Sequence, residues 1–369
     1  MFKNVRVLEL ASVLAGPSVG QFFAELGAEV TKVENLKTGG DVTRTWKATH
    51  EQTDDRSAYF CSVNWGKRSV AIDLTTSEGK QRVQRLAAQS DIIIASFKPG
   101  DAEKLGVAYA QLKEHHPALI YGQITGYGAH NPRVGYDAVL QAETGFMDLN
   151  GDKEGPPTKM PVALIDVLAA HHLKEGILLA LLKRERTGEG SLVEVSLVQA
   201  ALSSLVNQAS NWLVGGQLPA RQGSAHPNIA PYGDSFLTAD GKRILLAVGS
   251  DRQFFDLCEA LNIPDTANQQ AFATNHQRVQ NRLQLCELLT AAMAQWNATD
   301  LLARLHALKV PCGLVQNVKE ALAMPEADSL LLRRDGLTGI KTFVATGVVE
   351  AEQGLLPPPH FGQHNTQLE

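Results

Sequence analysis

The chain has 369 residues, of which 44% are hydrophobic and 20% are charged. This length predicts two to three domains, and the composition is that of an ordinary folded protein with a large core. Since 34 basic and 39 acidic residues give a formal net charge of −5, there is no general positive field for nucleic acid, and local lysines and arginines would have to bind any polyanionic ligand.

Strands alternate with helices in the first part of the chain. The strand segments 91–97 and 119–128 are nearly continuous apolar runs rich in β-branched residues, as buried parallel strands require. This alternation predicts an α/β fold with a Rossmann-like, doubly wound sheet that binds its ligand at the carboxyl edge of the strands. We expect strands at 5–10, 29–34, 69–74, 91–97 and 119–128, and helices at 18–26 and 77–89.

Residues 159–190 hold the longest apolar helix pattern of the chain, and Asp166 is the only carboxylate between Gly155 and Lys174. Basic residues at 183–186 and Gly188 mark the end of this helix. Asp166 therefore lies in the first turn. It is either an N-cap or a nucleophile, and in both cases the free amides of the first turn are expected to lower its pKa.

A change of pattern after Ser196 predicts a second, smaller α+β domain inserted between parts of the first. A hairpin with Asp240 and Gly241 at its turn begins it, and helices are expected at 252–261, 276–295 and 299–308. The domain limits expected are 1–195 for the large domain, 196–220 for a helical linker, 221–325 for the small domain and 326–369 for the return to the large domain.

Several segments, taken in order, resemble the family III CoA-transferases over nearly the whole chain. The stretch around Asp166 resembles the active-site segment of this family, whose catalytic aspartate falls at Asp166. The other matching segments are 5–34, GGDVTR at 39–44, NWGKRSVAIDL at 64–74, 91–107, GYDAVLQAETGF at 135–146 and PPPHFGQHN at 357–365.

The resemblance implies an enzyme that moves CoA from an acyl-CoA donor to a free carboxylic acid through an aspartyl-CoA thioester on Asp166. It implies no metal and no separate cofactor, with coenzyme A thioesters as substrates. It also implies an interlaced homodimer in which residues 1–195 form the CoA-binding domain. We expect neither nucleic acid nor a membrane as a partner.

The family's CoA-binding positions carry over to a defined set of residues. The loop Val13, Leu14 and Ala15 is expected to line the thioester, and its amides to stabilise an oxyanion. Asn35 stands where the family often has a phosphate-binding arginine, so Lys37 or Arg44 is expected to substitute. The full set of expected CoA-binding residues is Val13, Leu14, Ala15, Lys37, Arg44, Ile72, Ser96, Phe97, Lys104, Tyr136 and Asp137.

Other functions remain open at this point. Gly16, Ser18 and Gly20 match the GxSxG pattern of hydrolases, but this short pattern often occurs by chance. Related 2-methylacyl-CoA racemases carry a histidine base where this chain has Tyr136, and tyrosine is a poor base near neutral pH. An acyl-CoA thioesterase and a catalytically silent CoA-binding protein are the further alternatives.

The four cysteines are widely separated and show neither a CxxC motif nor zinc-ligand spacing, so free thiols in a reducing cytoplasm are expected. No apolar run reaches the ~18 residues that a membrane span needs. We therefore expect a cytoplasmic protein that does not enter the membrane.

Overall fold

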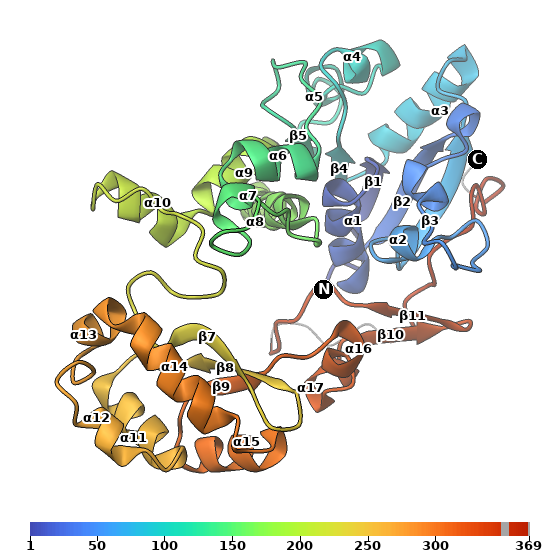
Figure 1. Cartoon of the computed structure of the whole chain (residues 1–369). Coiled ribbons are helices and arrows are strands. Elements are labelled where there is room, and N and C mark those ends of the chain that lie inside the picture. The colour runs from blue at the N-terminus through green and yellow to red at the C-terminus, as the bar shows by residue number, and fades with distance from the viewer. Residues whose placement is uncertain (348–353, 368–369) are drawn as a thin grey trace. The chain divides into compact units, whose positions relative to one another are not determined.

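The computed structural model describes residues 1–347 and 354–367, and its chain divides into two compact units (Figure 1). The first unit comprises Met1–Phe146, Lys159–Gly215 and Asp328–Glu369. The second comprises Met147–Thr158 and Gly216–Ala327. No helix among the described residues is long and apolar enough to cross a membrane.

The first unit is built on a six-stranded, fully parallel sheet with the strand order β3-β2-β1-β4-β5-β6. This is the order of dinucleotide-binding folds, so the predicted doubly wound α/β architecture is confirmed. The sequence did not predict β6, because its side chains are half-buried or exposed and form no apolar run. The strands are β1 (Arg6–Leu10), β2 (Glu29–Asn35), β3 (Lys67–Ile72), β4 (Ile92–Ala95), β5 (Ile120–Thr125) and β6 (Ser191–Ser196).

Each face of this sheet has its own hydrophobic core. Val7 belongs to a core with helices α1 (Ala15–Glu25) and α8 (Leu164–Thr187), whereas its neighbour Leu8 belongs to a core with α3 (Ser77–Ala88). Successive residues of a strand point to opposite faces, so apolar strands of this kind must be covered on both sides. The helices accordingly flank the sheet on two sides.

The other helical segments of the first unit are short. They connect the strands or precede and follow α8. They are η1 (Leu36–Thr38), η2 (Val42–Thr45), α2 (Ala58–Cys61), α4 (Asp101–Leu105), α5 (Tyr109–Lys113), α6 (Asp137–Glu143), α9 (Leu197–Ser203) and α10 (Val206–Leu213), while α7 (Phe146–Leu149) begins at the boundary between the units.

The C-terminal segment closes the β3 edge of the same sheet. The antiparallel pair β10 (Leu331–Arg334) and β11 (Leu337–Ile340) precedes it. The sequence of 336–359 predicts short strands followed by a proline-rich tail, and residues 348–353 of this stretch lie outside the described residues. The His364 N–H donates to the Ser69 carbonyl at 2.9 Å, and the Ala71 N–H donates to the Asn365 side chain at 2.8 Å. The end of the tail therefore packs on β3 of its own chain.

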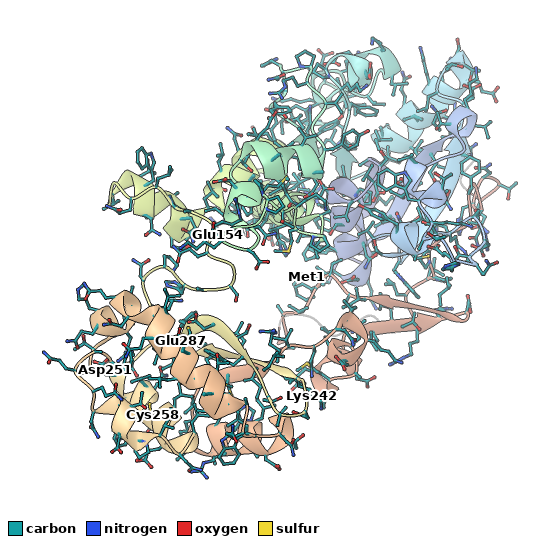
Figure 2. All side chains as sticks on the ribbon, in the orientation of Figure 1. Met1, Glu154, Lys242, Asp251, Cys258 and Glu287 are labelled. Atoms are coloured by element: carbon teal, nitrogen blue, oxygen red, sulfur yellow. The ribbon has the colours of Figure 1, made fainter. Side chains whose placement is uncertain are left out.

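The second unit packs five helices against a three-stranded antiparallel sheet. The predicted hairpin is confirmed, with β7 (Tyr232–Leu237) and β8 (Arg243–Ala247) paired and β9 (Cys312–Leu314) beside β8. The helix expected at 276–295 is instead two helices that meet at Asn281. Cys258, on α11, is buried in the core of this unit (Figure 2). The helices are α11 (Asp251–Ala260), α12 (Pro264–Ala267), α13 (Asn275–Gln280), α14 (Arg282–Met293) and α15 (Ala298–Ala307), followed by the single turns α16 (Val318–Ala321) and α17 (Pro325–Asp328).

Candidate active site

A cavity of about 270 Å³ opens at the carboxyl edge of the six-stranded sheet. β1 and β4 are neighbours in the sheet although β2 and β3 separate them in the sequence, so the strand order reverses between them. Ligands of doubly wound sheets bind at this point of reversal. The cavity walls are residues 12–16, 96–99, 124–126, 128 and 131–137, together with Asp166 and Leu197.

A second cavity of about 230 Å³ lies beside the first, since both are lined by Ser12, Ser96 and Phe97. Its walls include the end of β2 and three apolar side chains, Leu74, Val83 and Leu105. An elongated ligand can therefore lie across Ser96 and Phe97 with one end near Asp166 and the other among apolar side chains.

Asp166 lies in the first turn of α8, as the sequence predicted, but it does not cap this helix. The N-cap position is Ala163, and Asp166 is only 7% exposed. Burial, followed by the negative charge of Asp137, raises its pKa to about 7. The expected lowering of this pKa by first-turn amides was wrong, because desolvation of the carboxylate outweighs the helix dipole at this position.

Asp137, and not Asp166, provides the carboxylate that accepts a hydrogen bond at the N-terminus of α8. It is the first residue of α6, and its Oδ1 accepts a hydrogen bond from the Ile165 N–H at 2.8 Å. Its Oδ2 accepts another from the Gln141 side chain at 2.7 Å. Because the Asp137 carboxylate already accepts from an amide at the N-terminus of α8, Asp166 does not gain this stabilisation from the helix. Both acidic side chains line the same cavity.

The predicted loop Val13, Leu14 and Ala15 lies on the cavity, but α1 begins at Ala15 and not at Ser18. The GxSxG match is therefore helical. A Cβ on Gly16 would lie 2.4 Å from the Ala11 Cβ, and a Cβ on Gly20 would lie 2.0 Å from the Glu9 carboxylate. The two glycines thus allow α1 to pack closely on β1, so the pattern reflects packing and is no nucleophile elbow.

The structure places most of the predicted site residues on the two cavities but leaves three basic residues and Ile72 outside them. Ser96 and Phe97 line both cavities, and Tyr136 and Asp137 line the first. The predicted residues that line neither cavity are Lys37, Arg44, Ile72 and Lys104.

Arg44 is a buried structural cation. Its Nη2 and Nε donate to the two oxygens of Glu34 at 2.7 and 2.8 Å, and its side chain is only 4% exposed. Lys37 and Lys104 are exposed and pair with Asp73 and Asp101. Their roles in binding phosphate remain predictions.

Two cations line the first cavity. Lys98, three residues after β4, is one of the basic residues that the sequence offers as phosphate contacts, whereas Arg133 was not predicted. Arg133 stacks on the Tyr127 ring at 4.1 Å while pairing with Glu143. Arg133 sits in a glycine- and proline-containing stretch after β5. Its place after a buried strand is the sequence signal that could have identified it.

Two further groups were also missed, Tyr59 near Asp166 and Lys32 on the second cavity. Tyr59 forms an edge-to-face pair with Trp46, and burial, followed by the charges of Asp166 and Asp137, raises the pKa of Tyr59 to about 12. Lys32 is fully buried, with carboxylate partners that include Asp41. A lysine in the middle of an apolar strand signals such a network, because a buried ammonium must be paired.

One group of side chains among the described residues could gather around a metal ion, namely Asp54, Asp55 and His360. Their ligand atoms lie within 4.8 Å of one another, and all three residues are exposed. His360 Nδ1 already contacts the Asp55 carboxylate at 2.5 Å. The group lines neither cavity.

Comparison with known proteins identifies relatives along the whole chain. The family model described as CoA-transferase family III matches residues 2–365. Succinate–glutarate CoA-transferase of Agrobacterium fabrum (strain C58) is 37% identical over 99% of this chain and 94% of its own length. Human succinyl-CoA:glutarate CoA-transferase is 33% identical, with 99% and 84% covered.

A relative named for a different acid and a solved structure are also similar to this chain. Acetyl-CoA:oxalate CoA-transferase of Acetobacter aceti is 33% identical over 91% of this chain and 86% of its own. The crystal structure of a CAIB/BAIF family protein from Brucella suis superposes with a TM-score of 0.87 at 37% identity, covering 99% of this chain and 98% of that one.

Proposed function

We propose that Asp166 is the nucleophile of this chain, which belongs to CoA-transferase family III and moves coenzyme A from an acyl-CoA donor to a free carboxylic acid. The observation that carries the proposal is the position of Asp166. It is a buried carboxylate on a cavity at the point of strand reversal, beside the first-loop segment 12–16.

The chemistry proceeds in balanced steps. The Asp166 carboxylate attacks the thioester carbonyl, and the C–S bond breaks to give a mixed anhydride and CoA thiolate. The thiolate then attacks the Asp166 carbonyl of the anhydride, which releases the donor acid as a carboxylate and leaves an aspartyl-CoA thioester. The acceptor carboxylate reverses both steps, so the thioester energy is conserved throughout.

Burial supports each step. A carboxylate removed from water is a stronger nucleophile, and an anhydride in a closed site is shielded from hydrolysis. The backbone amides at the start of α1 have no acceptor within their helix, and segment 12–16 lines the cavity. We assign to these amides the oxyanion that forms at each attack.

We propose that the exchanged acids are short dicarboxylates such as succinate and glutarate. Relatives at 33–37% identity carry succinyl-CoA, glutarate and mesaconate in their names. The first cavity also offers Lys98 and Arg133, and a distal carboxylate needs a cation of this kind. Small acids such as oxalate, formate and acetate are the alternative class, since a relative named for oxalate is 33% identical.

The experiment is a transfer assay with succinyl-CoA and a panel of free acids, read by mass spectrometry. Asp166→Asn is expected to abolish transfer, because an amide forms no anhydride. Glu175→Gln, an exposed change on the same helix, is the control. Hydroxylamine should convert the aspartyl thioester into a hydroxamate on the peptide containing Asp166, and near-normal turnover of Asp166→Asn would remove this residue from the mechanism.

The same assay separates the competing functions. A thioesterase would release CoA at a rate independent of the acceptor acid. A racemase would exchange the α-proton of a 2-methylacyl-CoA in deuterated buffer, and we expect no such exchange because Tyr136 replaces the base. A silent CoA-binding protein would show neither activity nor an adduct.

We also propose that the enzyme is an interlaced homodimer. Large apolar side chains are exposed on the second half of α8 and at the end of α10 within the first unit, among them Leu179 at 67%, Leu213 at 77% and the C-cap residue Val214 at 87%. Exposure of this kind calls for a partner surface. If the subunits are threaded, tagged and untagged dimers mixed under native conditions should form no hybrids over days, and rapid hybrid formation would contradict threading.

A further inference from the structure

The segment between β1 and α1 is held in a strained conformation. Val13 has a φ of 72°, in the left-handed region that a β-branched residue rarely adopts. Residues 12–16 form part of the wall of the cavity that contains Asp166. A conformation that the residue itself disfavours persists only where surrounding groups impose it.

Asp41 is the group that contacts the strained residue directly. Both of its carboxylate oxygens accept from the Val13 N–H at 3.3 Å. Oδ1 also accepts from the N–H and the hydroxyl of Thr43, at 3.0 and 2.8 Å. The Asp41 side chain is completely buried, so these bonds operate without competition from water.

Two buried lysines extend this anchor to both ends of the segment. Lys32 Nζ contacts Asp41 at 2.9 Å, Glu9 at 2.8 Å and the Ala11 carbonyl at 2.8 Å. Lys67 Nζ pairs with the other Glu9 oxygen at 2.7 Å and donates to the Pro17 carbonyl at 2.8 Å.

Each ammonium group thus has three polar contacts, since Lys67 Nζ also donates to the Asn64 side chain at 2.9 Å. The network fixes the segment at three points: the Ala11 carbonyl, the Val13 N–H and the Pro17 carbonyl. Residues 12–16 lie between them.

We propose that Asp41 is a positioning residue for CoA transfer, which acts with Lys32 and Glu9 to hold segment 12–16 in the one conformation that forms the wall beside Asp166. Asp41 also lines the second cavity, but the role proposed here is exerted through segment 12–16 and not through a contact with the reacting atoms. The inference rests on the proposed function, because segment 12–16 supplies the oxyanion contacts assigned above.

The first test compares Asp41→Asn with a matched control. Asp73 makes the same local contacts as Asp41: it accepts from the N–H and hydroxyl of Thr75 and pairs with a lysine, but it does not contact segment 12–16. Asp41→Asn should lower kcat about 100-fold with KM for acyl-CoA unchanged, since small misplacements of catalytic groups cost this much. Asp73→Asn should stay within about twofold of wild type, as expected of a surface change.

Rescue distinguishes positioning from general support of the fold. Glycine reaches a positive φ without steric cost, so the double variant Asp41→Asn with Val13→Gly should regain about tenfold of the lost kcat, while its melting temperature stays low. Val13→Pro leaves the ionic network in place, removes the N–H and fixes φ near −65°. It should lose kcat as severely as Asp41→Asn, and it serves as the test if Asp41→Asn does not fold.

Hydrogen exchange supplies a readout that does not depend on catalysis. The peptide spanning 11–17 should exchange faster in Asp41→Asn than in wild type or Asp73→Asn. Unchanged exchange, kcat within twofold of wild type in Asp41→Asn or Val13→Pro, or a double variant no better than Asp41→Asn would each overturn the proposal. If the wild type transferred no CoA, the proposed function would fail and exchange alone would decide the role of Asp41.

Discussion

Replacing Asp166 by asparagine should stabilise the protein at neutral and alkaline pH while it abolishes transfer. The folded-state pKa of Asp166, about 7, lies above its ordinary value of 3.8, because burial disfavours the charged form. The stability that the protonated form contributes is therefore fully present below pH 3.8 and is lost as the pH rises through 7. Asparagine stays neutral at every pH and escapes this loss.

The size of the effect follows from the shift. A difference of about 3 pKa units corresponds to about 4 kcal/mol of unfolding free energy above pH 7, at about 1.4 kcal/mol per unit. At pH 5, which is only about one pH unit above the ordinary pKa, the loss of unfolding free energy is between about 1 and 2 kcal/mol. The advantage of Asp166→Asn should thus grow by about 2–3 kcal/mol between pH 5 and pH 8.

Urea unfolding of wild type, Asp166→Asn and Glu175→Gln at a series of pH values measures this difference. Glu175 is 70% exposed on the same helix, so its replacement should give a difference that barely changes with pH. A constant difference for Asp166→Asn between pH 5 and pH 8 would refute a raised pKa. If the first-turn amides dominated instead, the difference would shrink only as the pH rises toward the ordinary pKa of 3.8 and would stay constant above it.

Three further changes test the site and its support. The rate of adduct formation on Asp166 should rise with pH to a plateau above about 7, because the ionised carboxylate attacks. Asp137→Asn should move the midpoint of this pH profile to lower pH, and stopped-flow bursts across the range measure both profiles. Gly20→Ala should cost about 1–3 kcal/mol in urea unfolding because its Cβ meets the Glu9 carboxylate, whereas Gly249→Ala, with its nearest neighbour at 3.8 Å, should not. Arg44→Met should cost about 3–5 kcal/mol in urea unfolding because the buried Glu34 loses its bidentate cation, without changing the salt dependence of KM for acyl-CoA; Lys104→Met serves as the exposed control for stability alone.

The sheet was predictable because its signal is local. Strands β1, β4 and β5 are short and largely apolar, and strands alternate with helical patterns along this part of the chain, which favours parallel pairing with helices on both faces. Strand β6 lacks an apolar run because its side chains are only partly covered. The pairing of β6 with β5 becomes visible only in the folded sheet, where the two strands are in register.

The position of Asp166 was predictable, but its electrostatic state was not. The first turn of α8 can be inferred from apolar periodicity and the terminal glycine, whose φ of 75° confirms the expected cap. The pKa depends on how much water remains around the carboxylate and on Asp137, which comes from a different helix. These are tertiary quantities that no local pattern contains.

The charged residues show the same limit. Arg44 in the GGDVTR segment and a phosphate-binding arginine look alike in sequence, since both follow a strand end. The decisive fact is that Glu34 receives two hydrogen bonds from Arg44 inside the protein. Whether Arg44 also contacts a phosphate stays a prediction, because the sequence does not show that Glu34 is its buried partner.

The raised pKa of Asp166 also bears on the thermodynamics of the proposed exchange. Transfer of CoA to the enzyme consumes the buried Asp166 carboxylate and releases a carboxylate of the donor acid into water. The enzyme's charge is disfavoured by about 4 kcal/mol relative to an ordinary acid above pH 7, and formation of the neutral aspartyl thioester relieves that cost. On the proposed mechanism this relief would shift the equilibrium of the first half-reaction toward the enzyme thioester by about three powers of ten, at about 1.4 kcal/mol per factor of ten. The burial that destabilises the resting protein would then be the same interaction that lets Asp166 hold a thioester against a free acid.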